Sequence, residues 1–139
     1  MMKTIILLFI VWVPFLLQAQ NITSATLSWQ VTSVTDVNTG DILSTGGDQI
    51  ISHVNKSVEW KDSQGNVKYT YAVNTVNGTW SNVSNNGSVI YQITANGKVG
   101  TIAFVRSGSE ITIRILLLKE DGEDIPDMYE FKITGITTR

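Results

Sequence analysis

Apolar and polar residues alternate with a period of two in several short runs of the chain. The run VKYTYAV at 67–73 places its large side chains at every second position, as do SVIYQIT at 88–94 and EITIRILLLK at 110–119. This alternation is typical of a β-strand, because successive side chains of a strand point to opposite faces of the sheet. The pattern predicts about nine strands, at residues 26–37, 49–54, 57–61, 66–74, 79–84, 88–94, 98–105, 110–118 and 127–135.

Turn residues separate the predicted strands. Asn-Gly pairs at 77–78, 86–87 and 96–97 supply the positive φ angles that tight hairpin turns need. Short turns make consecutive strands neighbours in the sheet, and closing such a meander into a barrel removes its two exposed edges. We therefore expect an all-β fold, an antiparallel up-and-down meander closed into a small barrel, with a two-sheet β-sandwich as the alternative. Residues 37–48, which hold three glycines and little periodicity, are expected to form a long loop.

The same alternation predicts which side chains fill the barrel. Its phase points one set of aromatic residues inward and puts charged or hydroxyl side chains such as Glu59, Lys68 and Thr70 on the opposite face. A slip of one residue would turn all the rings toward water, so this register is strongly specified. The aromatic residues that we expect to face inward, and that are candidates to line a ligand site, are Trp29, Trp60, Tyr69, Tyr71 and Tyr91.

Trp80 stands in the small, polar stretch NGTWSNVSNNGS, which cannot bury it locally. We expect it to begin the strand 79–84 and to close one end of the barrel. Its strand partners would be Tyr71 or Val73 on one side and Tyr91 on the other. Trp80 is a further candidate ligand-binding residue, and the alternative to the closing role is a solvent-facing ring that stacks on a sugar.

The N-terminal residues have the layout of a secretory signal. One lysine is followed by an apolar run at 5–17 and then by the small residue Ala19. The run is shorter than the roughly 20 apolar residues that a membrane-spanning helix needs, and it contains a proline. We expect residues 1–20 to be removed as a signal peptide. The remaining single domain at 21–139 would have no membrane span and would be secreted or periplasmic.

Composition removes several classes of function. The chain has no cysteine, which excludes disulfides, zinc–thiolate sites and thiol catalysis. Its 10 Lys and Arg against 12 Asp and Glu give no basic patch for nucleic acid. We interpret His53 as a surface residue at a strand edge rather than a general base, and the acidic cluster at 120–124 as a hairpin tip rather than a calcium loop. We therefore expect no enzyme, no catalytic or metal-binding residue and no cofactor.

Three stretches of the chain carry a resemblance to a known family. LSWQVTSV at 27–34 puts a tryptophan in the first strand, NGTW follows at 77–80, and aromatic hairpins end in YEFKITG at 129–135. Together they resemble the small lipocalin-like domains that follow signal peptides in Bacteroidetes-type bacterial secreted proteins. The resemblance covers most of the domain and implies a barrel with a small apolar cavity.

The resemblance also has implications for individual residues. Trp29 matches the family's first-strand tryptophan, which stacks under an arginine from a late strand, and either Arg106 or Arg114 could take that role here. Two features depart from the family pattern. The residues before Trp29 read Leu-Ser where lipocalins have Gly-x, and nothing after Ile133 could form the usual C-terminal helix.

These observations leave three kinds of function open. The first is a non-enzymatic lipocalin-like domain that binds a small apolar molecule inside the barrel. The second is a structural or protein-interaction domain whose interior is full, because an eight-stranded barrel is only just wide enough for a cavity. The third is a carbohydrate-binding module that uses exposed aromatic rings. The sequence identifies no protein partner.

Overall fold

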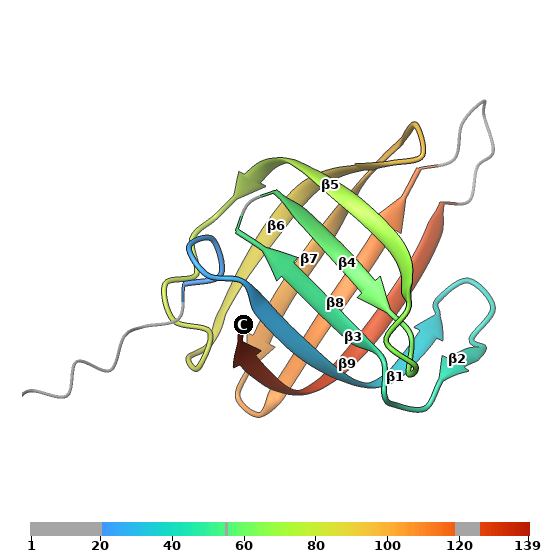
Figure 1. Cartoon of the computed structure of the whole chain (residues 1–139), viewed down its shortest axis with the longest axis horizontal. Coiled ribbons are helices and arrows are strands. Elements are labelled where there is room, and N and C mark those ends of the chain that lie inside the picture. Colours follow the sequence, from blue (N-terminus) through green and yellow to red (C-terminus); the bar gives the residue numbers. More distant parts are fainter. Residues whose placement is uncertain (1–20, 55, 119–125) are drawn as a thin grey trace, which may run out of the picture.

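All the strands of the protein join one strongly curved β-sheet (Figure 1). The computed structural model describes residues 21–54, 56–118 and 126–139. The expected signal peptide at 1–20 and the acidic cluster at 120–124 lie outside these residues. The nine strands are Leu27–Asp36 (β1), Ile42–Ser44 (β2), Gln49–His53 (β3), Ser57–Lys61 (β4), Val67–Asn77 (β5), Gly87–Ala95 (β6), Lys98–Ser107 (β7), Glu110–Leu117 (β8) and Asp127–Thr138 (β9).

The strands follow one another around a closed barrel. From β3 to β9 each strand pairs antiparallel with the next, and β1 pairs with both β3 and β9. The β1–β9 pairing runs from Leu27 beside Thr138 to Asp36 beside Tyr129, and it closes a barrel of eight strands to which β2 is added. The predicted all-β, up-and-down antiparallel barrel is therefore confirmed, and the sandwich alternative is not formed. Within the residues that the structure describes, no helix has the length and apolar character needed to span a membrane.

The segment 37–48, expected to be a long loop, contains the short strand β2. The second half of β1 pairs with β2, and its first half pairs with β3. Gly46 and Gly47, with φ angles of +137° and +87°, turn the chain between β2 and β3. Both strands therefore lie along the same edge of β1. Three residues are too few to show an alternation, so the sequence pattern does not reveal β2.

The strand predicted at 79–84 is not formed, because these residues belong to the loop 78–86 between β5 and β6. Instead, β5 continues to Asn77, and Gly78 with a φ of +96° turns the chain away from the strand. The side chain and the carbonyl oxygen of Asn82 then accept hydrogen bonds from backbone N–H groups two and three positions later. Such local hydrogen bonds compete with pairing in a sheet.

Large aromatic and β-branched side chains occupy the barrel interior. The ring of Phe104 lies between those of Trp29 and Tyr91, with centroids 5.0 Å apart in both pairs. Phe131 packs edge-on against Trp60 at 4.8 Å. Tilted and edge-on rings at these distances add a favourable electrostatic contact to the burial of apolar surface. The largest fully buried aromatic side chains are Trp29, Trp60, Tyr71, Tyr91, Phe104 and Phe131.

The two ends of the barrel differ in how they are covered. At the end that we call the closed end, residues 21–26 and the loop 78–86 lie across the opening, and Ile22, Trp80 and Val83 are buried there. The opposite end, which we call the mouth, is bordered by the β4–β5 and β6–β7 connections and by the end of β8 and the start of β9 (Figure 1). The contrast between these ends decides where a ligand site can lie.

Candidate functional site

Trp80 is buried at the closed end and lies in a loop rather than at a strand start. Its side chain is 3% exposed, and its ring centroid lies 5.9 Å from that of Trp29. The indole N–H donates to the carbonyl oxygen of Asn85 at 3.0 Å. Gly87 makes room for the ring, because a Cβ at that position would overlap the indole. A ring so deeply buried offers no face to a sugar.

Trp29 and Tyr91 lie in the filled interior, and their polar atoms have partners. The indole N–H of Trp29 donates to the Ser52 hydroxyl at 3.0 Å, and the Tyr91 hydroxyl donates to the carbonyl oxygen of Ile22 at 3.4 Å. Burial raises the pKa of Tyr91 to about 12, so its hydroxyl stays protonated at neutral pH. Neither residue lines the pocket described below, so both support the barrel from within.

The two arginines considered as partners of Trp29 make other contacts. Arg114 lies on the outer face of β8, where its guanidinium pairs with the carboxylate of Glu130 at 2.6 Å. Arg106 lies at the closed end, where its guanidinium donates to the carbonyl oxygen of Val83 at 3.1 Å. The rings that pack against Trp29 are those of Phe104 and Trp80.

A pocket of about 490 Å³ opens at the mouth. Its walls come from β5, from the hairpin between β6 and β7, and from the facing ends of β8 and β9. Of the predicted site residues, Tyr69 and Tyr71 line the pocket, and Trp60 lies behind Tyr69 with ring centroids 5.3 Å apart. The lining residues are Val67, Lys68, Tyr69, Thr70, Tyr71, Ala95, Asn96, Lys98, Leu117, Asp127 and Tyr129.

An aromatic cluster supports one side of this pocket. The ring of Trp60 contacts Tyr69 and also Tyr129, at a centroid distance of 5.5 Å. The indole N–H of Trp60 donates to Oδ2 of the buried Asp48 at 2.8 Å, and the Ser44 hydroxyl donates to Oδ1 at 2.9 Å. The connection between β2 and β3 therefore fixes the ring on which the tyrosines pack.

Tyr71 directs its hydroxyl to the pocket rather than to a protein partner. Its side chain is 1% exposed, and no group in the described part of the chain is hydrogen-bonded to its hydroxyl. Because Tyr71 lines the pocket, the small accessible part of this side chain faces the mouth. Burial raises the pKa of Tyr71 above its ordinary value, so the hydroxyl remains a donor. Because no side-chain N or O atom of the described residues is both buried and unpartnered, this hydroxyl is open to the pocket, where water or a ligand can bind it.

Lys68 reaches the pocket because of a β-bulge. Trp60 pairs with Tyr69 and Lys61 pairs with Val67, which leaves Lys68 as the extra residue between the two pairs. A bulge of this kind redirects a side chain. Here it brings Nζ of Lys68 to 4.4 Å from the centroid of the Trp60 ring, a cation–π contact. The prediction that Lys68 lies on the outer face is therefore wrong, because the bulge interrupts the period of two.

Several lining residues were not among the sequence-predicted candidates. A signal for Tyr129 was present, because it shares the alternation of YEFKI with the inward-facing Phe131. Lys98 and Ala95 are placed by the hairpin register, which the sequence alone does not give. Leu117 continues the inward-facing positions of β8 as far as the mouth.

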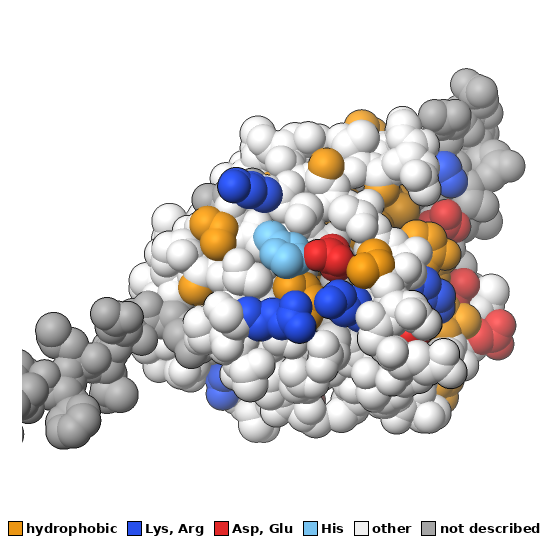
Figure 2. Space-filling model, viewed as in Figure 1, with side chains coloured by type: hydrophobic (Ala, Val, Ile, Leu, Met, Phe, Trp, Pro, Cys, Tyr) orange, Lys and Arg blue, Asp and Glu red, His pale blue; other side chains and the backbone are white. Residues whose placement is uncertain are grey.

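The single histidine lies away from the mouth. His53 forms an ion pair or hydrogen bond with Glu59, its neighbour on the outer face of β3 and β4, and Figure 2 shows the histidine beside an acidic side chain on this face. Among the described residues, no group of three or more His, Cys, Asp or Glu side chains is placed to hold a metal ion. The outer face therefore adds no metal ligand set to the pocket at the mouth.

Comparison with protein-family models, with curated proteins and with solved structures gave no match. The resemblance to lipocalin-like domains thus stays a prediction that rests on the sequence stretches named above. The closed antiparallel barrel is consistent with a small lipocalin-like barrel.

Proposed function

We propose that the protein is an exported, non-enzymatic binding domain of the lipocalin-like kind, which holds a small molecule with an apolar body in the mouth pocket. The observation that carries this proposal is the Tyr71 hydroxyl. It stays protonated, and it opens to the pocket instead of bonding to a group in the described chain. A donor on a nearly buried ring that opens to a pocket is available to a ligand that enters the pocket.

The size and lining of the pocket support the same proposal. Its volume of about 490 Å³ lies within the range of roughly 300–1,000 Å³ that is usual for small-molecule sites. Aromatic and aliphatic side chains with a few polar groups form the walls, as in most such sites, and the mouth of a β-barrel is a common location. The sequence predicted a ligand in the barrel interior. Because aromatic rings occupy the centre of the barrel, we propose the mouth as its site instead.

One observation favours a second candidate, a domain that docks a protein partner. Seven of the ten exposed large hydrophobic side chains of the described chain lie around the mouth. Figure 2 shows several exposed hydrophobic side chains toward the right of the view. These seven are Val37, Ile42, Leu43, Val67, Tyr69, Val99 and Leu118. By contrast, the three tryptophans of the described chain are buried, which disfavours a carbohydrate platform.

Titration with the apolar fluorescent probe N-phenyl-1-naphthylamine tests the proposal. We expect saturable binding to the purified protein, and we expect Ala95→Phe to abolish it by placing a ring in the pocket. The matched control is Ala72→Phe, which adds the same ring on the outer face of β5 and should leave binding unchanged. Absence of saturable binding, or equal loss in both variants, would refute the proposal and favour the protein-interaction domain.

A further inference from the structure

We propose that the ligand of the mouth pocket is an organic anion, in which an apolar body carries one carboxylate, sulfonate or phosphate group. The anionic group would be held at the rim by the ammonium groups of Lys68 and Lys98, with the Tyr71 hydroxyl as a further donor. This inference rests on the proposed function, because it names the chemistry of the molecule that enters the same pocket.

The position of Lys68 carries the first part of this inference. Simple alternation would direct its side chain to the outer face, but Lys68 lies in the bulge between the Trp60 and Lys61 pairs and its Nζ lies 4.4 Å from the centroid of the Trp60 ring. β-Bulges are common next to functional sites, where they re-aim a side chain. The ammonium group lies against the Trp60 ring, which holds it at the pocket wall while leaving its N–H donors available.

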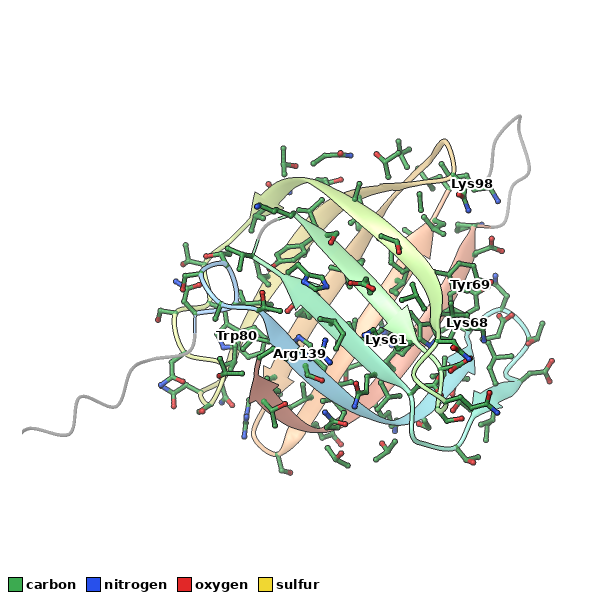
Figure 3. All side chains as sticks on the ribbon, in the orientation of Figure 1. Lys61, Lys68, Tyr69, Trp80, Lys98 and Arg139 are labelled. Atoms are coloured by element: carbon green, nitrogen blue, oxygen red, sulfur yellow. The ribbon has the colours of Figure 1, made fainter. Side chains whose placement is uncertain are left out.

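Lys98 is directed to the same pocket by a different device. Asn96 and Gly97 form the two-residue turn between β6 and β7, with φ angles of +51° and +77°. Such a turn makes Ala95 and Lys98 a directly opposed pair, and opposed residues of two antiparallel strands lie on the same face of the sheet. Ala95 is a buried inward-facing residue, so Lys98 also lies on the inner side. Figure 3 shows Lys98 and Lys68 at the same end of the barrel.

Among the described residues, the charged groups that line the pocket are two ammonium groups and one carboxylate, which favours an anion over a cation. Within the described residues neither lysine forms an ion pair, whereas the ion pairs present are His53–Glu59 and Arg114–Glu130 on the outer face. Asp127, the single carboxylate among the lining residues, has an interaction of its own within the chain.

The tyrosines that line the pocket add neutral hydrogen-bond donors and no negative charge. Burial, and after it the neighbouring Asp127, raises the pKa of Tyr129, and burial raises the pKa of Tyr71. Both hydroxyls are therefore protonated at neutral pH. A group that accepts hydrogen bonds and carries negative charge satisfies ammonium and phenol donors together, and charge-assisted hydrogen bonds are stronger than neutral ones.

Two probes with the same ring system test the inference. 8-Anilinonaphthalene-1-sulfonate and N-phenyl-1-naphthylamine share the anilinonaphthalene body, and only the first carries a sulfonate. We expect the purified protein to bind the sulfonate about tenfold more tightly, since a hydrogen bond to a charged group contributes about that factor or more. The part of the fluorescence signal that Ala95→Phe removes defines binding in the pocket, as opposed to binding at exposed apolar surface.

Lysine variants assign the preference to named groups. We expect Lys98→Met and Lys68→Met each to weaken sulfonate binding several-fold and to leave binding of the neutral probe within twofold. Lys68→Arg should retain the preference because it keeps the charge. Lys132→Met, which removes an ammonium on the outer face of β9, is the matched control and should change neither affinity.

The possible results separate this inference from the proposed function. Equal binding of both probes, or a sulfonate preference that survives both lysine variants, overturns the anion inference and leaves the binding function in place. A preference for the neutral probe likewise overturns the anion inference and leaves the binding function in place. Failure of both probes to bind in the pocket overturns the proposed function and the inference together. Circular dichroism of each variant verifies that the barrel is folded.

Discussion

The closed end and the mouth of this barrel both contain buried aromatic side chains, but the polar atoms of these side chains have different surroundings. At the closed end the indole N–H of Trp80 has a carbonyl partner, and the ring fits over Gly87. At the mouth Tyr71 is as deeply buried, yet its hydroxyl meets a pocket. Burial alone therefore does not distinguish a structural ring from one in a binding site. The two kinds of ring differ in whether the polar atom on the ring has a hydrogen-bond partner within the protein.

Charge separates the two ends as well. Arg106, a cation at the closed end, donates to backbone carbonyl oxygens. Of the two lysines at the mouth, Lys68 contacts an aromatic ring, and neither has a carboxylate partner among the described residues. One end thus uses its polar groups to complete the fold, and the other keeps them available. We expect mutations at the first end to change stability, and mutations at the second to change binding.

Truncating one aromatic ring at each end of the barrel should show the largest difference in stability. Trp80→Ala removes a buried ring from the closed end and should lower the free energy of unfolding by about 3–5 kcal/mol. Tyr69→Ala removes a ring that is 40% exposed at the mouth and should cost roughly 1 kcal/mol. Urea unfolding of both variants measures the difference. A loss below about 1 kcal/mol for Trp80→Ala would contradict its role in closing the barrel.

A single added methyl group should test the fit of the same ring. Gly87→Ala places a Cβ into the indole of Trp80, so we expect a loss of about 1–3 kcal/mol from overpacking. Gly135→Ala is the matched control, because a Cβ there meets no atom within 4 Å. Urea unfolding should show little change for this control. If Gly87→Ala costs as much in the Trp80→Ala background as in the wild type, the overlap is not the cause.

The sequence predicted most of the barrel because its strands alternate strongly. Val89, Tyr91 and Ile93 alternate with polar residues, and β6 forms within one residue of the predicted bounds. We predicted that the sheet closes into a barrel because an open meander would leave two exposed edge strands. The prediction for the segment around Trp80 was wrong because a tryptophan among Asn, Ser and Gly was interpreted as a strand residue. Its ring instead packs against Trp29, which is distant in sequence, and its backbone carbonyl oxygen accepts a hydrogen bond from the N–H of Ile22.

The site could be predicted only in part, for a related reason. The phase of β5 indicated Tyr69 and Tyr71, and both line the pocket. Lys68 required knowledge of the bulge, and a bulge depends on the register between two strands. Lys98 required the pairing across the β6–β7 turn. The unpartnered hydroxyl of Tyr71 is a property of the folded chain, so no spacing of residues could reveal it.

Alkaline pH should lower the stability of the fold through the buried tyrosines. Tyrosine in an unfolded chain ionises near pH 10, whereas burial raises the pKa of Tyr91 to about 12 in the folded protein. Unfolding therefore releases a proton above pH 10. The stability from this group is complete below about pH 10 and is lost as the pH rises toward 12. Urea unfolding across this interval should show a smaller decline for Tyr91→Phe than for the wild type. Equal declines would show that Tyr91 does not contribute.

The smallest expected effect on stability compares two hydroxyl deletions. Tyr91→Phe removes the donor to the Ile22 carbonyl oxygen and should cost about 0.5–1.5 kcal/mol. Tyr71→Phe removes a hydroxyl that has no partner in the described chain, so it should leave stability unchanged or raise it slightly. Urea unfolding at neutral pH measures both. A loss for Tyr71→Phe equal to that for Tyr91→Phe would mean that the hydroxyl is satisfied without a ligand.

Binding should show the opposite order for the same two variants. Tyr71→Phe keeps the ring and the pocket walls, so any loss of affinity for the anionic probe measures the hydroxyl alone. We expect a loss of about tenfold or more, because a hydrogen bond to a charged acceptor contributes about 1.5–3 kcal/mol. Tyr91→Phe should leave affinity unchanged, since Tyr91 does not line the pocket. A variant that gains stability while losing affinity would identify Tyr71 as a group held for the ligand rather than for the fold. Unchanged affinity would remove it from the site and leave the lysines as the polar contacts.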